Sequence, residues 1–158
     1  MNDREAAFRA RREKILLRQL LRLTRLMSDE TVARMRARGI EGMQLSYPRL
    51  LGNLDTEGTR LNALARRMGV TRQAVAQLAK EIEAAGFVER RPDPADGRGV
   101  IVAFTPRGRQ TLALAVEVMA EIEGEYAGAA GVSGFEDMHR TLKAILDRFD
   151  RSGEFGLD

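Results

Sequence analysis

The sequence contains no cysteine and a single histidine, His139, among its 158 residues. The absence of cysteine excludes disulfides, thiolate metal ligands and cysteine-based redox sensing. One histidine without cysteine supplies too few ligands for a usual zinc site, and it leaves no Cys–His pair for nucleophilic catalysis. We therefore expect no enzyme, no catalytic residues, no metal and no cofactor, and we expect His139 to lie on a surface or an interface.

Long apolar runs are also missing, so no segment is predicted to cross a membrane. The N-terminal segment is rich in arginine, but it carries Asp3, Glu5 and Glu13 and lacks the apolar core of a signal peptide. The predicted location is therefore the cytoplasm. With 44% apolar residues, the chain can bury the core of one ordinary globular domain.

Positive charge is abundant in the N-terminal part of the chain and scarce in the C-terminal part. Residues 1–38 hold eleven Lys/Arg and five Asp/Glu, whereas residues 115–158 hold four and ten. This separation fits a molecule with one side facing a polyanion, and it equally fits long helices with solvated faces. Within the acidic part, Glu121, Glu123 and Glu125 are predicted on a solvated face, because helix neighbours two apart point in different directions.

A long amphipathic helix is predicted over residues 4–38, because apolar residues recur there at helical spacing. The apolar stripe consists of Leu16, Leu17, Leu20, Leu21, Leu23 and Met27. A cationic stripe on another face consists of Arg11, Lys14, Arg18, Arg22 and Arg25. The cationic stripe is either a solvated face or a contact for phosphate or an anionic ligand.

Glycines at positions 39 and 42 are expected to end this helix. A short helix then begins after Ser46, with Pro48 in its first turn, and runs to about Leu54. Another helix is predicted over residues 61–68.

A helix-turn-helix is predicted in the middle of the chain. The helix over residues 61–68 ends at Gly69, and Thr71 caps a second helix that runs to Ala85. Two helices joined by a short glycine-containing turn are typical of this motif. One face of the second helix is apolar and predicted to be buried, with Val75, Leu78, Ala79 and Ile82. The opposite face, with Gln73, Ala76, Gln77 and Lys80, suits base edges in a major groove or an ordinary solvated surface.

A β-hairpin is predicted after the second helix, from the segments GFVER and GVIVAFT. The Pro/Asp/Gly cluster between them predicts a loop that is longer than a tight hairpin requires, with Asp96 and Arg98 at its tip. The order helix, turn, helix, strand, loop, strand is that of a winged helix-turn-helix, in which the loop is the wing. An arginine at the tip of a wing is attracted by the negative potential of a narrow minor groove.

Two helices are predicted after the hairpin. Thr105 and Pro106 begin a helix that runs to about Tyr126. Ser133 and Glu136 form a capping box for the last helix. Its apolar residues alternate by three and four, which favours a helical partner, and they are Phe135, Met138, Leu142, Ile145 and Phe149.

From Leu64 to Arg109 the chain reads LARRMGVTRQAVAQLAKEIEAAGFVERRPDPADGRGVIVAFTPRGR and resembles the MarR family of bacterial transcriptional regulators. The most specific part is DPADGRG, in which Asp96 and Arg98 match the family's Asp-x-Arg wing signature. The flanking helices match in order and length over nearly the whole chain. The resemblance implies a mainly α (α+β) fold, a winged helix-turn-helix with long N- and C-terminal dimerisation helices.

The expected division places an N-terminal dimerisation helix at residues 1–40 and a DNA-binding domain at residues 46–109. Dimerisation helices at residues 106–150 and a tail at 151–158 follow. The resemblance further implies a homodimer that binds a pseudo-palindromic site on double-stranded DNA, and a small organic anion, often an aromatic acid, as effector.

The resemblance also implies roles for individual residues. The expected DNA-binding residues are Thr71, Arg72, Gln73, Gln77, Lys80, Asp96 and Arg98. Arg98 matches the arginine that enters the minor groove, and Asp96 matches the acid that holds that arginine. Gly97 departs from the family, which often has a second basic residue there.

A DNA-binding regulator, most simply a repressor, is the expected function, and it has two alternatives. A winged-helix module that binds only proteins would usually expose an apolar patch, and the face with Gln73 and Gln77 is polar. An enzyme lacks a nucleophile, a metal site and a phosphate loop, since the glycines around Arg98 are turn residues.

Overall fold

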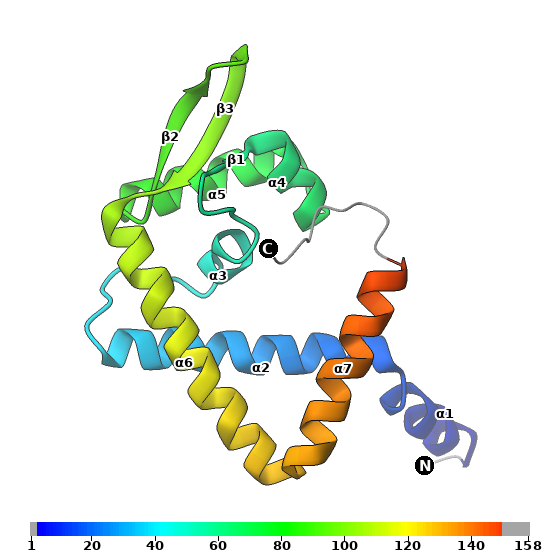
Figure 1. Cartoon of the computed structure of the whole chain (residues 1–158). Coiled ribbons are helices and arrows are strands. Elements are labelled where there is room, and N and C mark those ends of the chain that lie inside the picture. The colour runs from blue at the N-terminus through cyan, green and yellow to red at the C-terminus, as the bar shows by residue number, and fades with distance from the viewer. Residues whose placement is uncertain (1–2, 150–158) are drawn as a thin grey trace.

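The computed structural model describes residues 3–149, so the tail expected over residues 151–158 lies outside the described residues (Figure 1). The predicted fold class is confirmed: this part of the chain is mainly helical and contains a small antiparallel sheet with strand order β1-β3-β2. The elements in chain order are α1 (Asp3–Glu13), α2 (Leu16–Ala37), α3 (Tyr47–Leu51), β1 (Thr59–Arg60), α4 (Leu61–Met68), α5 (Arg72–Ala84), β2 (Val88–Asp93), β3 (Asp96–Phe104), α6 (Pro106–Ala130) and α7 (Val132–Phe149).

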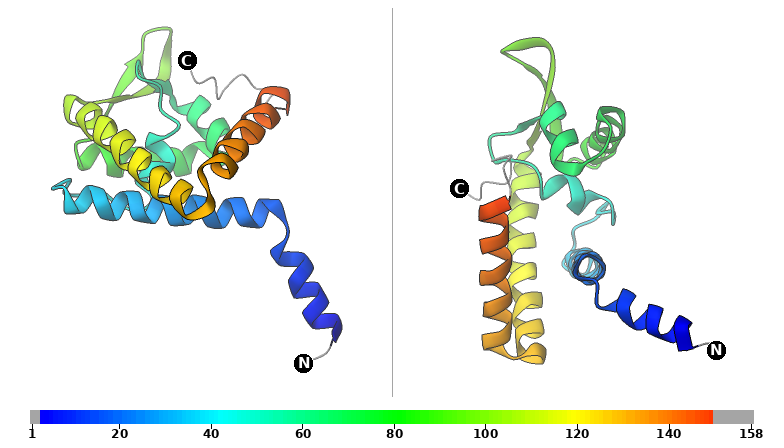
Figure 2. Two further views of the ribbon diagram at one scale, coloured as in Figure 1. Left: turned by 60° about the horizontal axis from the view of Figure 1, so that its bottom comes forward. Right: turned by 90° about the vertical axis from the view of Figure 1, so that its right-hand side faces the viewer.

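Helices α3, α4 and α5 and the sheet gather on one side of α2, and the β2–β3 hairpin points away from α2 (Figure 1). Helix α6 crosses α2, and α7 turns back from the end of α6 to form a V with it (Figure 1). Helix α1 projects away from the rest of the molecule (Figure 2). The two ends of the chain therefore contribute helices that extend beyond the compact middle.

The hydrophobic core lies between the helix-turn-helix, the base of the sheet and the crossing of α2 and α6. The largest fully buried side chains are Phe87, Met35, Leu50, Leu64, Ile82, Ile122, Val32, Val75, Val88, Val102 and Val118. The predicted apolar stripe of α5 belongs to this core, since Val75, Ala79 and Ile82 are fully buried and Leu78 is half-buried. The core thus fixes which face of α5 remains outside.

The prediction of one helix over residues 4–38 is wrong, because the chain leaves the helical conformation at Lys14 and Ile15. Ile15 has an extended backbone with φ −70° and ψ 116°, a conformation that its β-branched side chain favours. Residues 14 and 15 include no proline or glycine, so no local signal indicates the break. The cationic stripe is consequently split: Arg11 lies on α1, and Arg18, Arg22 and Arg25 lie on α2.

The prediction of a long wing loop is also wrong. Asp93 pairs with Asp96, so only Pro94 and Ala95 form the turn of the hairpin. Pro92 pairs with Val100, and the three residues 97–99 therefore form a bulge in β3. The extra residues are accommodated because a bulge can take up chain within a strand while the hairpin turn stays short.

Three helix ends also differ from the prediction. The short helix α3 ends at Leu51, and Ser46 precedes it in a helical conformation without a side-chain cap. Helix α6 continues to Ala130 because residues 126–130 contain three alanines, which are strong helix formers. Helix α7 begins at Val132 directly after Gly131, so Ser133 and Glu136 lie inside its first turns and form no capping box.

Candidate nucleic-acid interface

The turn between α4 and α5 is built as the sequence predicts. Gly69 ends α4 in the left-handed conformation, with φ 62°, which glycine adopts without strain. The Thr71 hydroxyl accepts a hydrogen bond from the backbone N–H of Ala74 at 3.2 Å, and this contact caps α5. The first residue of α5, Arg72, is therefore held at a defined position.

The face of α5 opposite the core is polar and accessible. Gln73, Gln77 and Lys80 are exposed, and Ala76 is half-buried. The Gln77 amide donates a hydrogen bond to Glu81 at 3.0 Å, one helical turn further on. Three of the predicted contact residues thus form one exposed face that carries amides and a cation.

In the wing, the Asp96 carboxylate accepts a hydrogen bond from the backbone N–H of Arg98 at 3.0 Å. The resemblance implied that Asp96 holds this arginine, and the contact holds its backbone. The Arg98 guanidinium makes no hydrogen bond or ion pair with any side chain between residues 3 and 149. It is therefore free to bind a ligand.

A second aspartate, which sequence reasoning missed, anchors the wing. The side chain of Asp93 is only 3% exposed, and its Oδ2 lies 2.6 Å from Arg60 Nε on β1. Its Oδ1 accepts a hydrogen bond from the backbone N–H of Ala95 at 3.0 Å. This backbone hydrogen bond and the Arg60 pair hold the pKa of Asp93 below its usual value.

The close approach of this carboxylate explains a glycine in the wing. A Cβ at position 99 would lie 2.7 Å from the Cβ of Asp93, so Gly99 is required where β3 passes Asp93. An aspartate directly before a Pro-Ala turn is a signal that could have indicated Asp93. Nothing in the local sequence indicates its partner, Arg60.

The base of the hairpin is tied to α5. Glu83 on α5 accepts hydrogen bonds from the backbone N–H of Arg90 at 2.9 Å and from Arg90 Nε at 2.8 Å. The hydrogen bond from the Arg90 side chain is the main reason that the pKa of Glu83 is lowered. The hairpin is thus tied to α5 at its base and to β1 near its tip.

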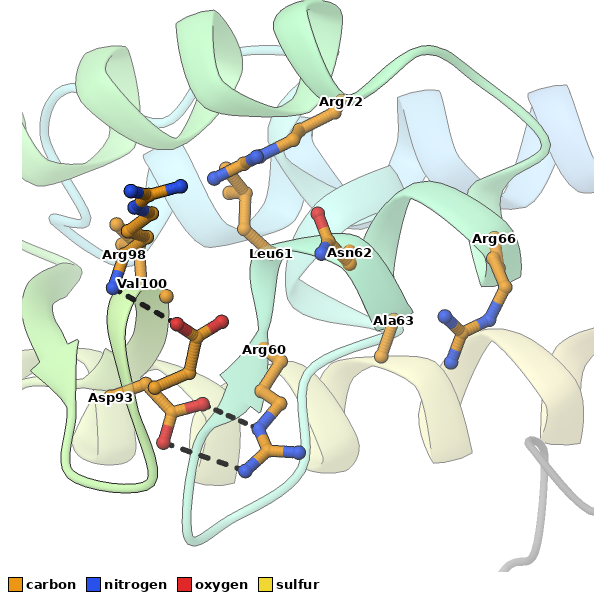
Figure 3. A pocket seen from close by; sticks show the side chains of 11 residues that line it. Arg60, Leu61, Asn62, Ala63, Arg66, Arg72, Asp93, Arg98 and Val100 are labelled. Carbon is orange, nitrogen blue, oxygen red and sulfur yellow. Dashed lines mark hydrogen bonds and ion pairs between the residues drawn. The ribbon is translucent and has the colours of Figure 1, made fainter.

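A pocket of about 280 Å³ lies between the wing and the start of α4 and α5 (Figure 3). Its polar lining comprises Arg60, Asn62, Arg66, Arg72, Asp93, Asp96 and Arg98. The side chains of Arg72 and Arg98 extend into it from different elements and toward one another (Figure 3). Three of the predicted DNA-binding residues, Arg72, Asp96 and Arg98, are therefore brought together in one basic pocket.

The crossing of α2 and α6 is held by a cluster of ion pairs. Arg34 donates hydrogen bonds to both oxygens of Glu125, at 2.9 and 2.7 Å, and to Glu30 at 2.5 Å. Arg38 donates to Glu121 at 2.5 Å. The hydrogen bond from Arg34 holds the pKa of Glu125 below its usual range. Glu121 and Glu125 are exposed, as predicted for a solvated face, and in addition they pair with the arginines of α2.

A mostly apolar cavity of about 100 Å³ lies between α2, α3 and α6. Its lining comprises Thr31, Met35, Met43, Pro48, Leu51, Gly52, Phe104, Gly108, Thr111, Leu112, Ala115 and Met119. No charged side chain lines the cavity, and the cationic stripe of α2 is not part of it.

His139 is exposed on α7 and its ring packs against that of Phe135, with 5.0 Å between centroids. Among the described residues, no three His, Asp or Glu side chains are grouped so as to hold a metal ion. None of the helices within residues 3–149 is long and apolar enough to cross a membrane.

A protein-family model described as the MarR family matches residues 41–99, which include α3 to the bulge of β3. This segment of the chain is similar to the MarR family. All of the expected DNA-binding residues, from Thr71 to Arg98, fall within the matched segment, as do Arg60 and Asp93.

Solved structures and curated proteins resemble this chain over most of its length. The transcriptional regulator BldR from Sulfolobus solfataricus is 27% identical, with a TM-score of 0.65, and the match covers 94% of this chain and 100% of BldR. Reduced AbfR bound to DNA has the same fold at 21% identity, with a TM-score of 0.57 and coverage of 90% and 98%. The uncharacterized protein Rv2011c from Mycobacterium tuberculosis is 24% identical over 106 residues, which are 67% of this chain and 74% of that protein.

Proposed function

We propose that this protein is a DNA-binding transcriptional regulator of the MarR family. The observation that carries the proposal is the exposed polar face of α5, which lies beside a wing and a pocket rich in arginine. Glutamine can form two hydrogen bonds with adenine in the major groove, so Gln73 and Gln77 are suited to read bases. Lys80 and the N-terminal residues Thr71 and Arg72 are suited to contact the backbone that flanks them.

We propose that the wing, with Asp96 and Arg98, lies along the neighbouring minor groove. The anchors at Asp93 and Glu83 support this role, because they fix the direction of the hairpin. The structure of AbfR bound to DNA, which has the same fold, supports DNA as the ligand. A protein-interaction module is less well supported, since the exposed face of α5 is polar.

The functional unit is proposed to be a homodimer. Helix α7 has no buried residue, although Ile145, Leu146 and Phe149 are 42%, 58% and 69% exposed. Leu17 and Leu21 on α2 are each 64% exposed. Apolar stripes of this extent favour burial against a second copy, so residues 1–40 and 106–150 are proposed as dimerisation segments. Two-fold symmetry would place the two α5 helices in successive major grooves about 34 Å apart.

Selection of bound DNA from random duplexes by the purified protein tests the proposed function. We expect an inverted repeat with one half-site for each protomer. An unrepeated motif would contradict the dimeric arrangement, and the absence of any enrichment would contradict the function.

Substitution of Gln77 on α5 tests the reading of bases. Gln77→Ala should weaken the base preference at one position of each half-site, whereas non-specific binding, which depends on phosphate charge, should stay nearly constant. Gln44→Ala, the same chemical change on the exposed loop between α2 and α3, is the matched control. Equal effects of the two substitutions on base preference would contradict the proposal that α5 contacts the bases.

We further propose that the protein represses its targets and that a small organic anion releases it from DNA. The cavity between α2, α3 and α6 offers apolar contacts and two buried threonines for the body of such a ligand. Titration with benzoate and with its uncharged analogue benzamide tests the charge of the effector. A preference for benzoate supports an anion, and equal binding of both would exclude a requirement for charge.

A further inference from the structure

We propose that Arg72 and Arg98 together bind one phosphodiester group of the DNA backbone in the pocket between the wing and α5. This inference rests on the proposed DNA-binding function and specifies which atoms of the DNA Arg98 contacts. It assigns Arg98 a role in backbone binding, in place of the minor-groove contact that the family resemblance implied.

The bulge in β3 determines where Arg98 points. Residues 97–99 are inserted between the pairs Pro92–Val100 and Asp93–Asp96, and Asp96 holds the backbone N–H of Arg98. Bulges redirect side chains relative to a regular strand. The Arg98 side chain extends toward α4 and α5, and it lines the pocket (Figure 3).

Arg72 reaches the same pocket from the start of α5. The first turn of α5 contains no acidic residue, although a helix N-terminus favours negative charge. A cation at this position is unfavourable for the helix on its own, and an anion bound between the cation and the helix end would reverse that effect. The side chain of Arg72 makes no hydrogen bond or ion pair within the described residues.

The two unpaired guanidinium groups point toward one another (Figure 3). Like charges that share a pocket repel, and an anion between them converts this repulsion into attraction. Arg60 is already neutralised by Asp93, which leaves Arg72 and Arg98 against the carboxylate of Asp96. Arg72, Arg98 and Asp96 together carry a net charge of +1, which suits an anion such as a phosphodiester.

The position of the pocket suits the strand that separates two grooves. Helix α5 lies on one side and the wing on the other, so the backbone between a major groove and the next minor groove would pass over the pocket. Planar guanidinium groups bind phosphate oxygens through paired hydrogen bonds. The pocket is therefore a phosphate site that lies between the groove contacted by α5 and the groove contacted by the wing.

Neutralising single phosphates tests this proposal. Duplexes carrying the selected operator would contain one uncharged methylphosphonate at successive backbone positions, and binding would be measured by fluorescence anisotropy. For the wild-type protein, we expect one position in each half-site at which neutralisation weakens binding about tenfold. For the variants Arg72→Ala and Arg98→Ala, a methylphosphonate at that position should weaken binding by less than a further twofold, because the arginine that binds this phosphate is already missing.

Arg91→Ala is the matched control for charge. Arg91 lies on β2 of the same wing and donates a hydrogen bond to the carbonyl of Glu57, and it does not line the pocket. This variant should retain the full tenfold sensitivity at the shared position. All three variants should unfold at temperatures close to that of the wild-type protein, because these side chains are exposed.

The alternative is that Arg98 contacts bases in the minor groove. Replacement of guanine by inosine in the DNA next to the wing tests this alternative. This exchange removes an amino group from the minor groove and leaves the phosphates unchanged. The proposal is overturned if Arg98→Ala abolishes the effect of inosine on binding and leaves the effect of methylphosphonate unchanged at every backbone position. It is also overturned if Arg72 and Arg98 couple to different phosphates.

Titration with inorganic phosphate alone, at constant ionic strength, separates a free anion from DNA as the ligand. Weak millimolar binding supports the DNA phosphodiester, and micromolar binding would make a free anion the ligand and overturn the assignment. A wild-type protein that binds no duplex would contradict the proposed function itself. Normal DNA binding without a shared phosphate would contradict only this inference.

Discussion

Helices α5 and α7 have similar amphipathic sequences and opposite environments. On α5, Val75, Ala79 and Ile82 are fully buried within the same chain. On α7, no residue is buried, although its apolar residues repeat at the same helical spacing. The winged helix-turn-helix therefore has a complete core within a single chain, whereas the apolar face of α7 is uncovered within the described residues.

The comparison extends to the two halves of α2. The C-terminal half contributes Val32 and Met35 to the core, and Arg34 and Arg38 bind glutamates of α6. In the N-terminal half, Leu17 and Leu21 are mostly exposed. One helix thus belongs to both regions, and it connects the DNA-binding part to the proposed interface.

A charge on the apolar face of α7 should give the largest effect. Ile145→Glu would place a carboxylate in the proposed dimer interface, where an unpaired buried charge costs several kcal/mol, of the order of 3–5. Light scattering should then give the 17.6 kDa of one chain, and operator binding should be lost at concentrations at which the wild-type protein binds.

Lys143→Glu is the control for this substitution, because Lys143 lies on the same helix and pairs with Asp147 at 3.2 Å on its polar side. This variant should remain dimeric. A wild-type mass of one chain at micromolar concentration would contradict the comparison between α5 and α7.

A cavity in the core of the winged domain should give the next largest effect. Leu64→Ala removes a fully buried side chain of α4 and should reduce the free energy of unfolding by about 2–5 kcal/mol. Urea denaturation at fixed protein concentration would measure it.

Leu17→Ala compares the exposed N-terminal half of α2 with the buried core. Leu17→Ala and Leu64→Ala are each made in the monomeric Ile145→Glu background. Leu64→Ala should keep its full effect there. Leu17→Ala should cost less than about 0.5 kcal/mol, because its side chain is exposed in the isolated chain. Similar losses for the two variants would show that the N-terminal half of α2 has a complete environment in one chain.

Loss of the partner of Asp93 should have a more local effect. The pKa of Asp93 is lowered in the folded chain, so its contribution to stability is present at neutral pH and is lost as the pH falls from its unfolded pKa through its lowered folded pKa. Arg60→Met should raise the midpoint of the Asp93 carboxyl titration, observed by NMR. The midpoint should stay below the usual value, because the backbone N–H of Ala95 remains.

Hydrogen exchange would report the consequence for the wing. The amides of β3 near Val100 should exchange several-fold faster in Arg60→Met, and those of α7 should not change. An unchanged Asp93 midpoint would show that Arg60 does not act on this carboxylate.

Local sequence signals predicted the helix-turn-helix well because its determinants are local. Gly69 ends a helix and Thr71 caps the next through contacts within a few residues, so the pattern and the structure agree. The Asp-x-Arg signature likewise indicated the wing. The roles of individual DNA-binding residues were implied by resemblance, and they stay predictions.

Features that depend on distant residues could not be predicted in the same way. The pair of Asp93 with Arg60 and that of Glu125 with Arg34 join residues 33 and 91 positions apart. The bulge in β3 depends on strand register, which composition does not reveal because prolines and glycines suit both loops and bulges. The break at Ile15 has no glycine or proline to signal it.

The two predicted helix caps provide the smallest and most closely matched test. Thr71 and Ser46 both stand directly before a helix, and both were predicted to cap it. Thr71 has an extended backbone, with ψ 149°, and its hydroxyl accepts a hydrogen bond from Ala74. Ser46 has ψ −21° and makes no side-chain cap.

Thr71→Ala should therefore reduce the free energy of unfolding by about 1 kcal/mol, the usual effect of losing a side-chain cap, and Ser46→Ala should leave it nearly unchanged. Urea denaturation of both variants at one protein concentration would measure the difference. Equal losses would mean that Ser46 caps α3 in solution. A loss for neither would mean that the fold of α5 depends on the burial of Val75, Ala79 and Ile82 alone, because their contacts would then hold the first turn without the threonine.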